Sequence, residues 1–98
     1  ILGAGGLFVQ QSESPLYHSN TIIKSMHQNL RSAGFSDTQT LLFPQCVYPS
    51  GWWSCTMACK DGKIPAARNQ KSFATQYYNH EVHQASKVLP EFMKKALA

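Results

Sequence analysis

Apolar and polar positions alternate along the chain in two different periods, which predict strands and helices in turn. Residues Leu7 to Gln11 form a short, largely apolar run, the pattern of a strand buried on both faces of a sheet. From His18 to Ala33, apolar residues recur at helical spacing, with Ser19 or Asn20 as the N-cap and Gly34 as the stop. This amphipathic helix would cover one face of the sheet.

Two further strands are predicted on either side of a short loop. The runs from Thr38 to Phe43 and from Trp52 to Cys59 are rich in β-branched, aromatic and other apolar residues. The loop between them contains Tyr48-Pro49-Ser50-Gly51, in which proline and glycine favour a reversal. A short connection joins antiparallel neighbours, so we expect an antiparallel pair.

The rest of the chain is predicted to be helical after a polar loop from Ala66 to Thr75. Helical spacing predicts one helix from His80 to Val88, and Pro90 opens a second from Glu91 to Leu97. The order of elements is strand, helix, strand, strand and two helices. It predicts an α/β fold that forms half of an open sheet and ends in an antiparallel strand.

Composition and charge narrow the classes of function. The chain has 98 residues, enough for one small domain, and a net charge of +4 carried by scattered Lys and Arg residues. Diffuse charge of this kind does not indicate a nucleic-acid surface. No apolar stretch is long enough to cross a membrane, so a soluble protein is expected. The chain starts at Ile1 without a methionine or a secretory signal and therefore looks cut from something longer.

The three cysteines indicate the compartment. Cys46, Cys55 and Cys59 are odd in number and lack the paired spacing of disulfide or zinc frameworks. We interpret them as buried thiols in strands of a protein from a reducing compartment, here the cytoplasm.

His80 and His83 have a spacing that two metal ligands could use, but no third ligand is signalled, so packing or capping is favoured over a metal site.

Candidate chemistry gathers around the predicted loop. Tyr48, Trp52 and Trp53 place three aromatic rings beside a tight turn, which suits an apolar or cationic ligand. The alternative is an aromatic corner that only caps a core. Because side chains alternate along a strand, only one of the two tryptophans can face a pocket.

Four motifs occur in order along the chain and carry a family resemblance. They are Gly5-Gly6-Leu7-Phe8-Val9 with Gln11, Ile23-Lys24-Ser25-Met26, Tyr48-Pro49-Ser50-Gly51 with Trp53-Ser54, and Tyr77-Tyr78-Asn79 through Val82-His83 and Ala85 to Leu89-Pro90-Glu91-Phe92. Together they resemble the C-terminal portion of the spermidine synthases, the polyamine aminopropyltransferases. The resemblance covers nearly the whole chain.

The resemblance implies a fold, a reaction and an assembly. Residues 1–98 would be the C-terminal part of a Rossmann-like, class I methyltransferase-like catalytic domain, without its N-terminal domain and donor-binding half. Family members move an aminopropyl group from decarboxylated S-adenosylmethionine to putrescine, giving spermidine and methylthioadenosine. The donor is a co-substrate, and no cofactor or metal is implied. A homo-oligomer, either a dimer or a tetramer, is expected.

The resemblance also assigns residues on the acceptor side. Tyr48 would lie along the diamine, Trp53 would wall the pocket and Gln11 would stand at a strand end beside it, with Glu13 a weaker companion. Trp52 would face a helix or a partner subunit. The catalytic aspartate of the family lies outside this chain, so no catalytic residue is predicted here and the chain alone is expected to be inactive. Two alternatives stay open: a class I methyltransferase-like domain and a non-catalytic partner subunit.

Overall fold

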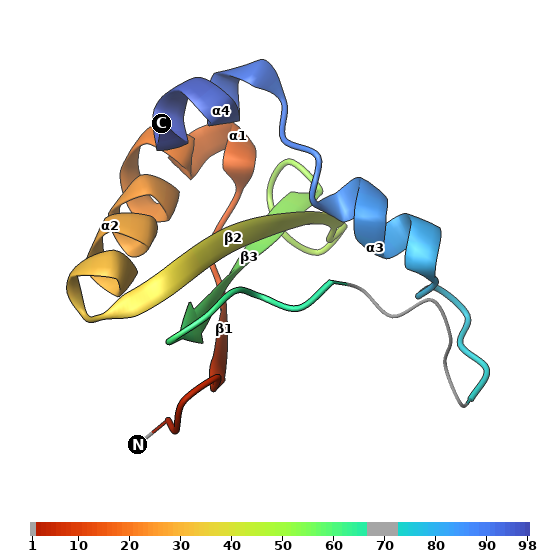
Figure 1. The fold of residues 1–98 in the computed structure, drawn as a ribbon. Coiled ribbons are helices and arrows are strands. Elements are labelled where there is room, and N and C mark those ends of the chain that lie inside the picture. The colour runs from red at the N-terminus through yellow and green to blue at the C-terminus, as the bar shows by residue number, and fades with distance from the viewer. Residues whose placement is uncertain (1, 67–72) are drawn as a thin grey trace.

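The computed structural model describes residues 2–66 and 73–98. Within these residues, the fold consists of three strands and several short helices (Figure 1). In chain order they are β1 (Leu7–Gln11), α1 (Pro15–His18), the π-helical turn η1 (Ser19–Ile23), α2 (Lys24–Ser32), β2 (Phe35–Pro44), β3 (Trp52–Lys60), α3 (His80–Ser86) and α4 (Glu91–Leu97). Part of the loop predicted from Ala66 to Thr75 falls on residues 67–72 and so lies outside the described residues.

The sheet has the order β1-β3-β2, with β3 antiparallel to both neighbours. The predicted antiparallel pair and the α/β character are therefore confirmed, but the central place of β3 was not predicted. Because β1 and β2 both oppose β3, they run parallel to each other. Helices α1, α2 and α4 gather on one side of the sheet, while α3 stands apart beside the end of β2 (Figure 1).

The long predicted helix begins earlier than expected and is divided. Ser14, not Ser19 or Asn20, is the N-cap: its Oγ accepts a hydrogen bond from the Leu16 N–H at 3.2 Å. Proline at the first helical position favours this start, because its fixed φ suits a helix and its missing N–H is not needed there. The stop at Gly34 is confirmed, since this residue takes a φ of +104° that glycine tolerates.

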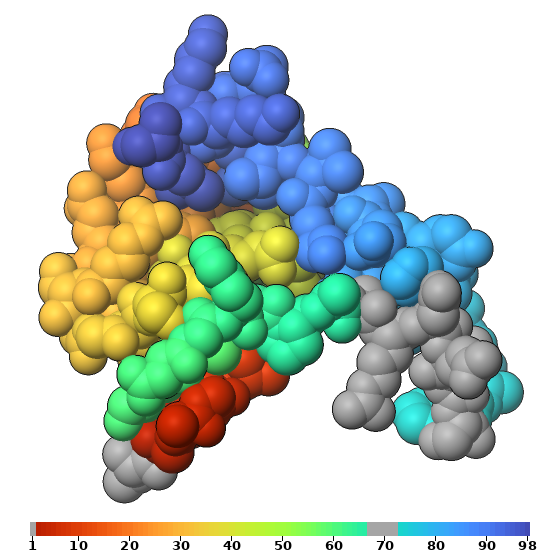
Figure 2. Space-filling view, in the orientation of Figure 1, coloured from red at the N-terminus to blue at the C-terminus, as the bar shows by residue number. Residues whose placement is uncertain are grey.

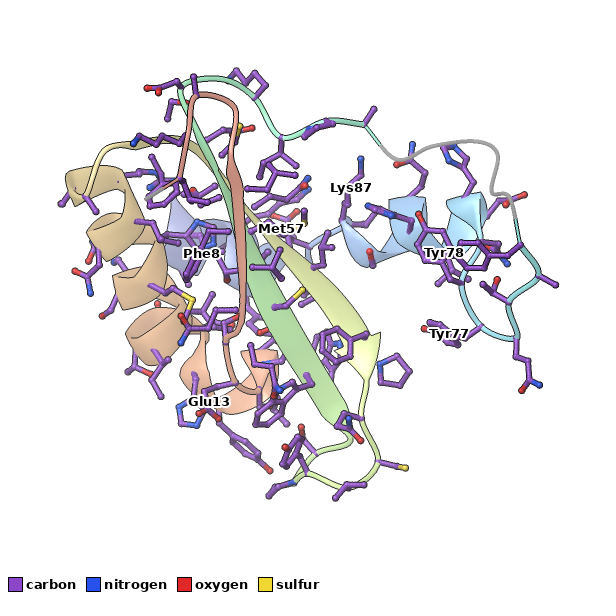
Figure 3. All side chains as sticks on the ribbon, turned by 90° about the horizontal axis from the view of Figure 1, so that it is seen from below. Phe8, Glu13, Met57, Tyr77, Tyr78 and Lys87 are labelled. Carbon is purple, nitrogen blue, oxygen red and sulfur yellow. The ribbon has the colours of Figure 1, made fainter. Side chains whose placement is uncertain are left out.

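Strand β1 is not buried on both faces, so that prediction was wrong. Leu7 and Val9 are 43% and 56% exposed. Phe8 points toward α2, and Met57 of the neighbouring strand lies on the opposite side of the sheet (Figure 3). The reason is position: among the described residues, β1 is an edge strand and is hydrogen-bonded to β3 alone. Burial on both faces requires layers on both sides, and within residues 2–66 and 73–98 only the helix side of β1 is covered.

The core lies between the sheet and helices α2 and α4. Ile23 and Met93 are fully buried there, together with Ala58 of β3. In the space-filling view, the dark-blue α4 rests against the orange helical segment that includes α2 (Figure 2). No helix in the described part of the chain is both long enough and apolar enough to span a membrane.

The cysteines follow the prediction only in part. Cys59 is buried and Cys55 is half-buried, both in β3, and all three thiols are free. Cys46 is exposed instead, because β2 ends at Pro44 and leaves this residue in the turn that follows. Helix α4 has its predicted bounds, whereas α3 ends at Ser86, two residues before the predicted end.

Candidate functional site

The turn that joins β2 to β3, residues 45–51, folds back on itself and will be called the aromatic turn. The Gln45 N–H donates to the Gly51 carbonyl at 2.9 Å, and the Gly51 N–H donates to the Tyr48 carbonyl at 3.1 Å. Ser50 and Gly51 take left-handed φ values of +73° and +65°, which reverse the chain. This reversal carries the Tyr48 ring back over the start of β3.

The three residues predicted to bind substrate meet in one cluster. The ring of Tyr48 stacks on the ring of Trp53, with centroids 4.3 Å apart and planes at 24°. Trp53 Nε1 donates a hydrogen bond of 2.9 Å to Gln11 Oε1. Trp53 is only 9% exposed, whereas Tyr48 keeps 40% of its surface accessible. Three separate segments thus build one wall, which will be called the ring wall.

Trp52 points to the other face of the sheet, as alternation along the strand requires. Its ring meets Phe92 of α4 edge to face, at 6.0 Å between centroids and 73° between planes. The prediction that Trp52 faces a helix is confirmed. The two tryptophans therefore lie on opposite faces of the sheet. Trp52 packs against α4, and Trp53 contacts Tyr48 and Gln11.

The indole hydrogen bond fixes the amide orientation of Gln11. An indole N–H can only donate, so the amide oxygen must face Trp53. The NH₂ group and the second lone pair of the oxygen remain for other partners. The ring wall thus offers an aromatic surface beside a donor and an acceptor. This combination suits a molecule with an apolar middle and polar ends.

A buried chain of hydrogen bonds on the opposite face of the sheet was missed by the sequence analysis. Ser12 and Ser54 join at 2.8 Å, Thr56 donates to Ser12 at 3.0 Å and bonds Thr40 at 2.9 Å. Thr40 bonds His27 Nε2 at 2.6 Å. The sequence signal was present, because hydroxyl residues take alternate positions of β3 that face the helices. Ser12 and Ser54 directly follow Gln11 and Trp53. Their hydrogen bond therefore fixes the register of β1 against β3 next to the ring wall.

His27 is neutral in this chain of hydrogen bonds. Burial first, and the nearby Arg31 charge second, lower its pKa from 6.5 to about 4. Its Nδ1 bonds Thr38 Oγ1 at 2.9 Å, so both ring nitrogens have partners. A neutral imidazole donates from one nitrogen and accepts at the other, which anchors α2 to β2 through two threonines.

Glu13, the weaker companion, lies beyond the end of β1, next to α1 (Figure 3). It takes a left-handed φ of +73°, and its carbonyl accepts a hydrogen bond from Ser54 Oγ at 2.8 Å. The backbone of Glu13 is therefore attached to β3 one residue after Trp53. The sharp bend at Glu13 turns the chain from β1 into α1.

His83 of α3 lines a pocket together with Phe43 and Cys55 of the sheet. His83 Nδ1 bonds the Tyr78 hydroxyl at 2.8 Å, and the two rings meet edge to face. Tyr78 lies beside α3 (Figure 3). Burial, followed by the charges of Lys87 and His80, lowers the pKa of His83. Among residues 2–66 and 73–98, no group of three or more His, Cys, Asp or Glu side chains could hold a metal ion.

Comparison with known proteins identifies the family. The family model described as "Spermine/spermidine synthase domain" matches residues 1–70. The chain belongs to this family. A polyamine aminopropyltransferase from Thioalkalivibrio sulfidiphilus is 56% identical over 100 residues, and one from Methylococcus capsulatus is 52% identical over 99. These alignments cover 98% of this chain in each case.

Solved structures of spermidine synthases agree with the fold of this member of the family. The crystal structure of spermidine synthase from Thermotoga maritima matches with a TM-score of 0.80 and 34% identity over 98% of the chain. A spermidine synthase in complex with the transition-state analogue AdoDATO matches with a TM-score of 0.77 and 34% identity over 95% of the chain. The chain spans about a third of the length of these relatives, 34 to 35%.

Proposed function

We propose that the protein to which this chain belongs transfers an aminopropyl group from decarboxylated S-adenosylmethionine to a diamine, putrescine being the expected acceptor. The products are spermidine and methylthioadenosine, and the ring wall forms the acceptor side of the site. The observation that carries this proposal is the meeting of Tyr48, Trp53 and Gln11 in a chain of this family.

The ring wall suits both parts of a diamine. The methylene groups of the diamine gain contact with the face of Tyr48 that is not stacked on Trp53, since this ring is large, largely apolar and 40% exposed. An ammonium end is attracted to the negative face of an aromatic ring and can donate to a hydroxyl or amide oxygen. The Tyr48 hydroxyl and Gln11 Oε1 are the oxygens assigned to that contact.

The proposed reaction needs a base as well as a wall. The amine nitrogen forms a bond to the aminopropyl carbon while the carbon–sulfur bond breaks. The electron pair of the broken bond stays on sulfur, so the sulfonium becomes the neutral thioether of methylthioadenosine. An ammonium ion has no lone pair for this attack, so a carboxylate must first accept its proton. The chain contains five acidic residues, and Asp37 and Glu91 are engaged in bonds to the Ile64 N–H and to Lys94. We assign the base to an aspartate outside this chain. Residues 1–98 alone should therefore be inactive.

We also propose that the three strands are part of a larger, Rossmann-like sheet. Strands β1 and β2 run parallel with β3 inserted between them, and the outer edge of β1 carries no partner strand among the described residues. This supports a place at the C-terminal end of a larger, Rossmann-like sheet. A cytoplasmic homo-oligomer, dimer or tetramer, is part of the proposal.

Aminopropyl transfer by the full-length protein tests the function. The protein is incubated with decarboxylated S-adenosylmethionine and, separately, with putrescine, cadaverine, agmatine and spermidine, and methylthioadenosine is measured by chromatography. We expect release that requires an amine, with putrescine the best acceptor. Absence of methylthioadenosine with every amine would contradict the proposal and favour a non-catalytic subunit. Methyl transfer from S-adenosylmethionine would favour a methyltransferase.

A further inference from the structure

A pair of hydroxyls attaches the aromatic turn to Ser14, the N-cap of α1. Ser14 Oγ and Ser50 Oγ lie 3.0 Å apart. Among the hydrogen bonds of residues 2–66 and 73–98, this is the one that joins the turn to a segment other than the strands beside it. Ser14 is 2% exposed and lies three residues after Gln11, so the pair connects two parts of the ring wall.

The surrounding donors give this pair one consistent proton arrangement. The Leu16 N–H donates to Ser14 Oγ, and the Trp52 N–H donates to Ser50 Oγ, each at 3.2 Å. Ser50 Oγ also lies 3.2 Å from the Trp52 carbonyl, which can only accept. The Ser50 proton therefore goes to Trp52, and the Ser14 proton goes to Ser50. Each hydroxyl then donates one hydrogen bond and accepts at least one.

We propose that Ser14 and Ser50 are positioning residues for the amine acceptor, an inference that rests on the proposed function. Ser50 follows Tyr48 by two residues and holds a left-handed φ of +73°, which a serine side chain disfavours. The bond to Ser14 opposes relaxation of this strained backbone. It thereby keeps the Tyr48 ring stacked on Trp53, with the exposed face of Tyr48 presented to the amine.

A positioning role predicts a specific kinetic pattern. Loss of the pair loosens Tyr48 but leaves the donor site and the base untouched. The KM for putrescine should therefore rise, whereas the KM for decarboxylated S-adenosylmethionine and kcat should change less than about twofold. Removal of one hydrogen bond of this kind corresponds to a rise in amine KM of about two- to tenfold.

The experiment compares variants of the full-length protein. Ser50→Ala removes the bond and leaves the helix cap at Ser14 intact, and Ser14→Ala removes both. Ser14→Thr keeps a hydroxyl and should restore a KM near that of wild type. Ser36→Ala is the matched control, because the Ser36 hydroxyl also bridges two segments, to Gly62 O at 2.6 Å, beside the opposite end of β1. The control should leave both KM values unchanged.

A spectroscopic measurement separates this inference from the proposed function. The near-ultraviolet circular dichroism of wild type minus that of Tyr48→Leu reports the coupled Tyr48–Trp53 rings. This difference should shrink by about half or more in the Ser50→Ala background, even in a protein with no transferase activity. An unchanged difference, or an unchanged amine KM in an active enzyme, overturns the inference. Equal rises in both KM values also overturn it, because they indicate general destabilisation.

Discussion

Trp53 serves the candidate site through two different properties of one side chain. Its ring face supports Tyr48, while its N–H orients Gln11. At 9% exposure it has little contact with solvent, so the ring is held in place by its neighbours. In the proposed site, we therefore expect Trp53 to act by arranging two more exposed groups, Tyr48 and Gln11.

Replacement of Trp53 by Phe separates these two properties. Phenylalanine retains a ring for Tyr48 but cannot donate to Gln11 Oε1, so the amide loses its fixed orientation. We expect the KM for putrescine to rise about two- to tenfold, the range for one hydrogen bond. Trp52→Phe is the control, because Trp52 packs against α4 on the opposite face. Steady-state kinetics with an unchanged KM for Trp53→Phe would contradict the assigned role of the indole N–H.

Replacement of Tyr48 distinguishes its ring from its hydroxyl. Tyr48→Leu removes the stacked ring and should lower kcat/KM for putrescine by about tenfold or more, since ring contacts contribute roughly 0.5 to 2 kcal/mol each. Tyr48→Phe keeps the ring and should have a smaller effect, confined to amines whose ammonium end reaches the hydroxyl. Specificity constants are measured for several amines. If Tyr48→Phe changes none of them, the hydroxyl has no role in the site.

At the scale of elements, the sequence predicted the strands better than their arrangement. The pattern located β3 and α4 correctly because alternation and helix-start signals are local. The central place of β3 depends on contacts far apart in the chain. Ser14 was missed as the helix start because the apolar period is clear only from Ile22 onward. The ring-wall residues came from the family resemblance, but their mutual contacts required the structure.

The hydrogen-bonded chain beneath the sheet makes the stability of α2 against β2 dependent on pH. His27 has a pKa of about 4 in the folded protein and 6.5 as its ordinary value, so the unfolded state binds more protons between these values. Stability should be unaffected by this group above about pH 6.5 and fall as the pH drops toward 4. Allowing for solvent screening, the loss is on the order of 1 to 3 kcal/mol below the folded pKa.

Denaturant unfolding of wild type and His27→Gln between pH 7 and pH 4 measures this effect. Glutamine can bond both threonines with its amide but does not titrate, so the variant should lose less stability over the same interval. His83, whose pKa is also lowered, is present in both proteins, and the difference between them isolates His27. Parallel pH profiles would show that His27 does not control the acid limb.

On the scale of the whole molecule, β1 is at odds with its own sequence. Its apolar residues suit a covered strand, yet Leu7 and Val9 are largely exposed and one edge of β1 is unpaired within the described residues. A groove of about 800 Å³ lies beside it, lined by residues including Phe8, Ile22 and Met26. The apolar sequence of β1 suits a strand that is covered on both faces. The relatives are about three times as long as this chain, so we expect the cover for β1 to come from residues outside it.

The exposed edge predicts that copies of the chain 1–98, prepared without the rest of the protein, associate through β1. An unpaired apolar strand presents backbone donors and acceptors that another copy can complete. Val9→Lys places a charge on this strand and should shift the chain toward monomer, as measured by concentration-dependent light scattering. Gln28→Lys adds the same charge at an exposed position of α2 and should have no such effect. A wild-type chain that stays monomeric at high concentration would show that the edge tolerates solvent, and the argument for a larger sheet beyond β1 would lose its support.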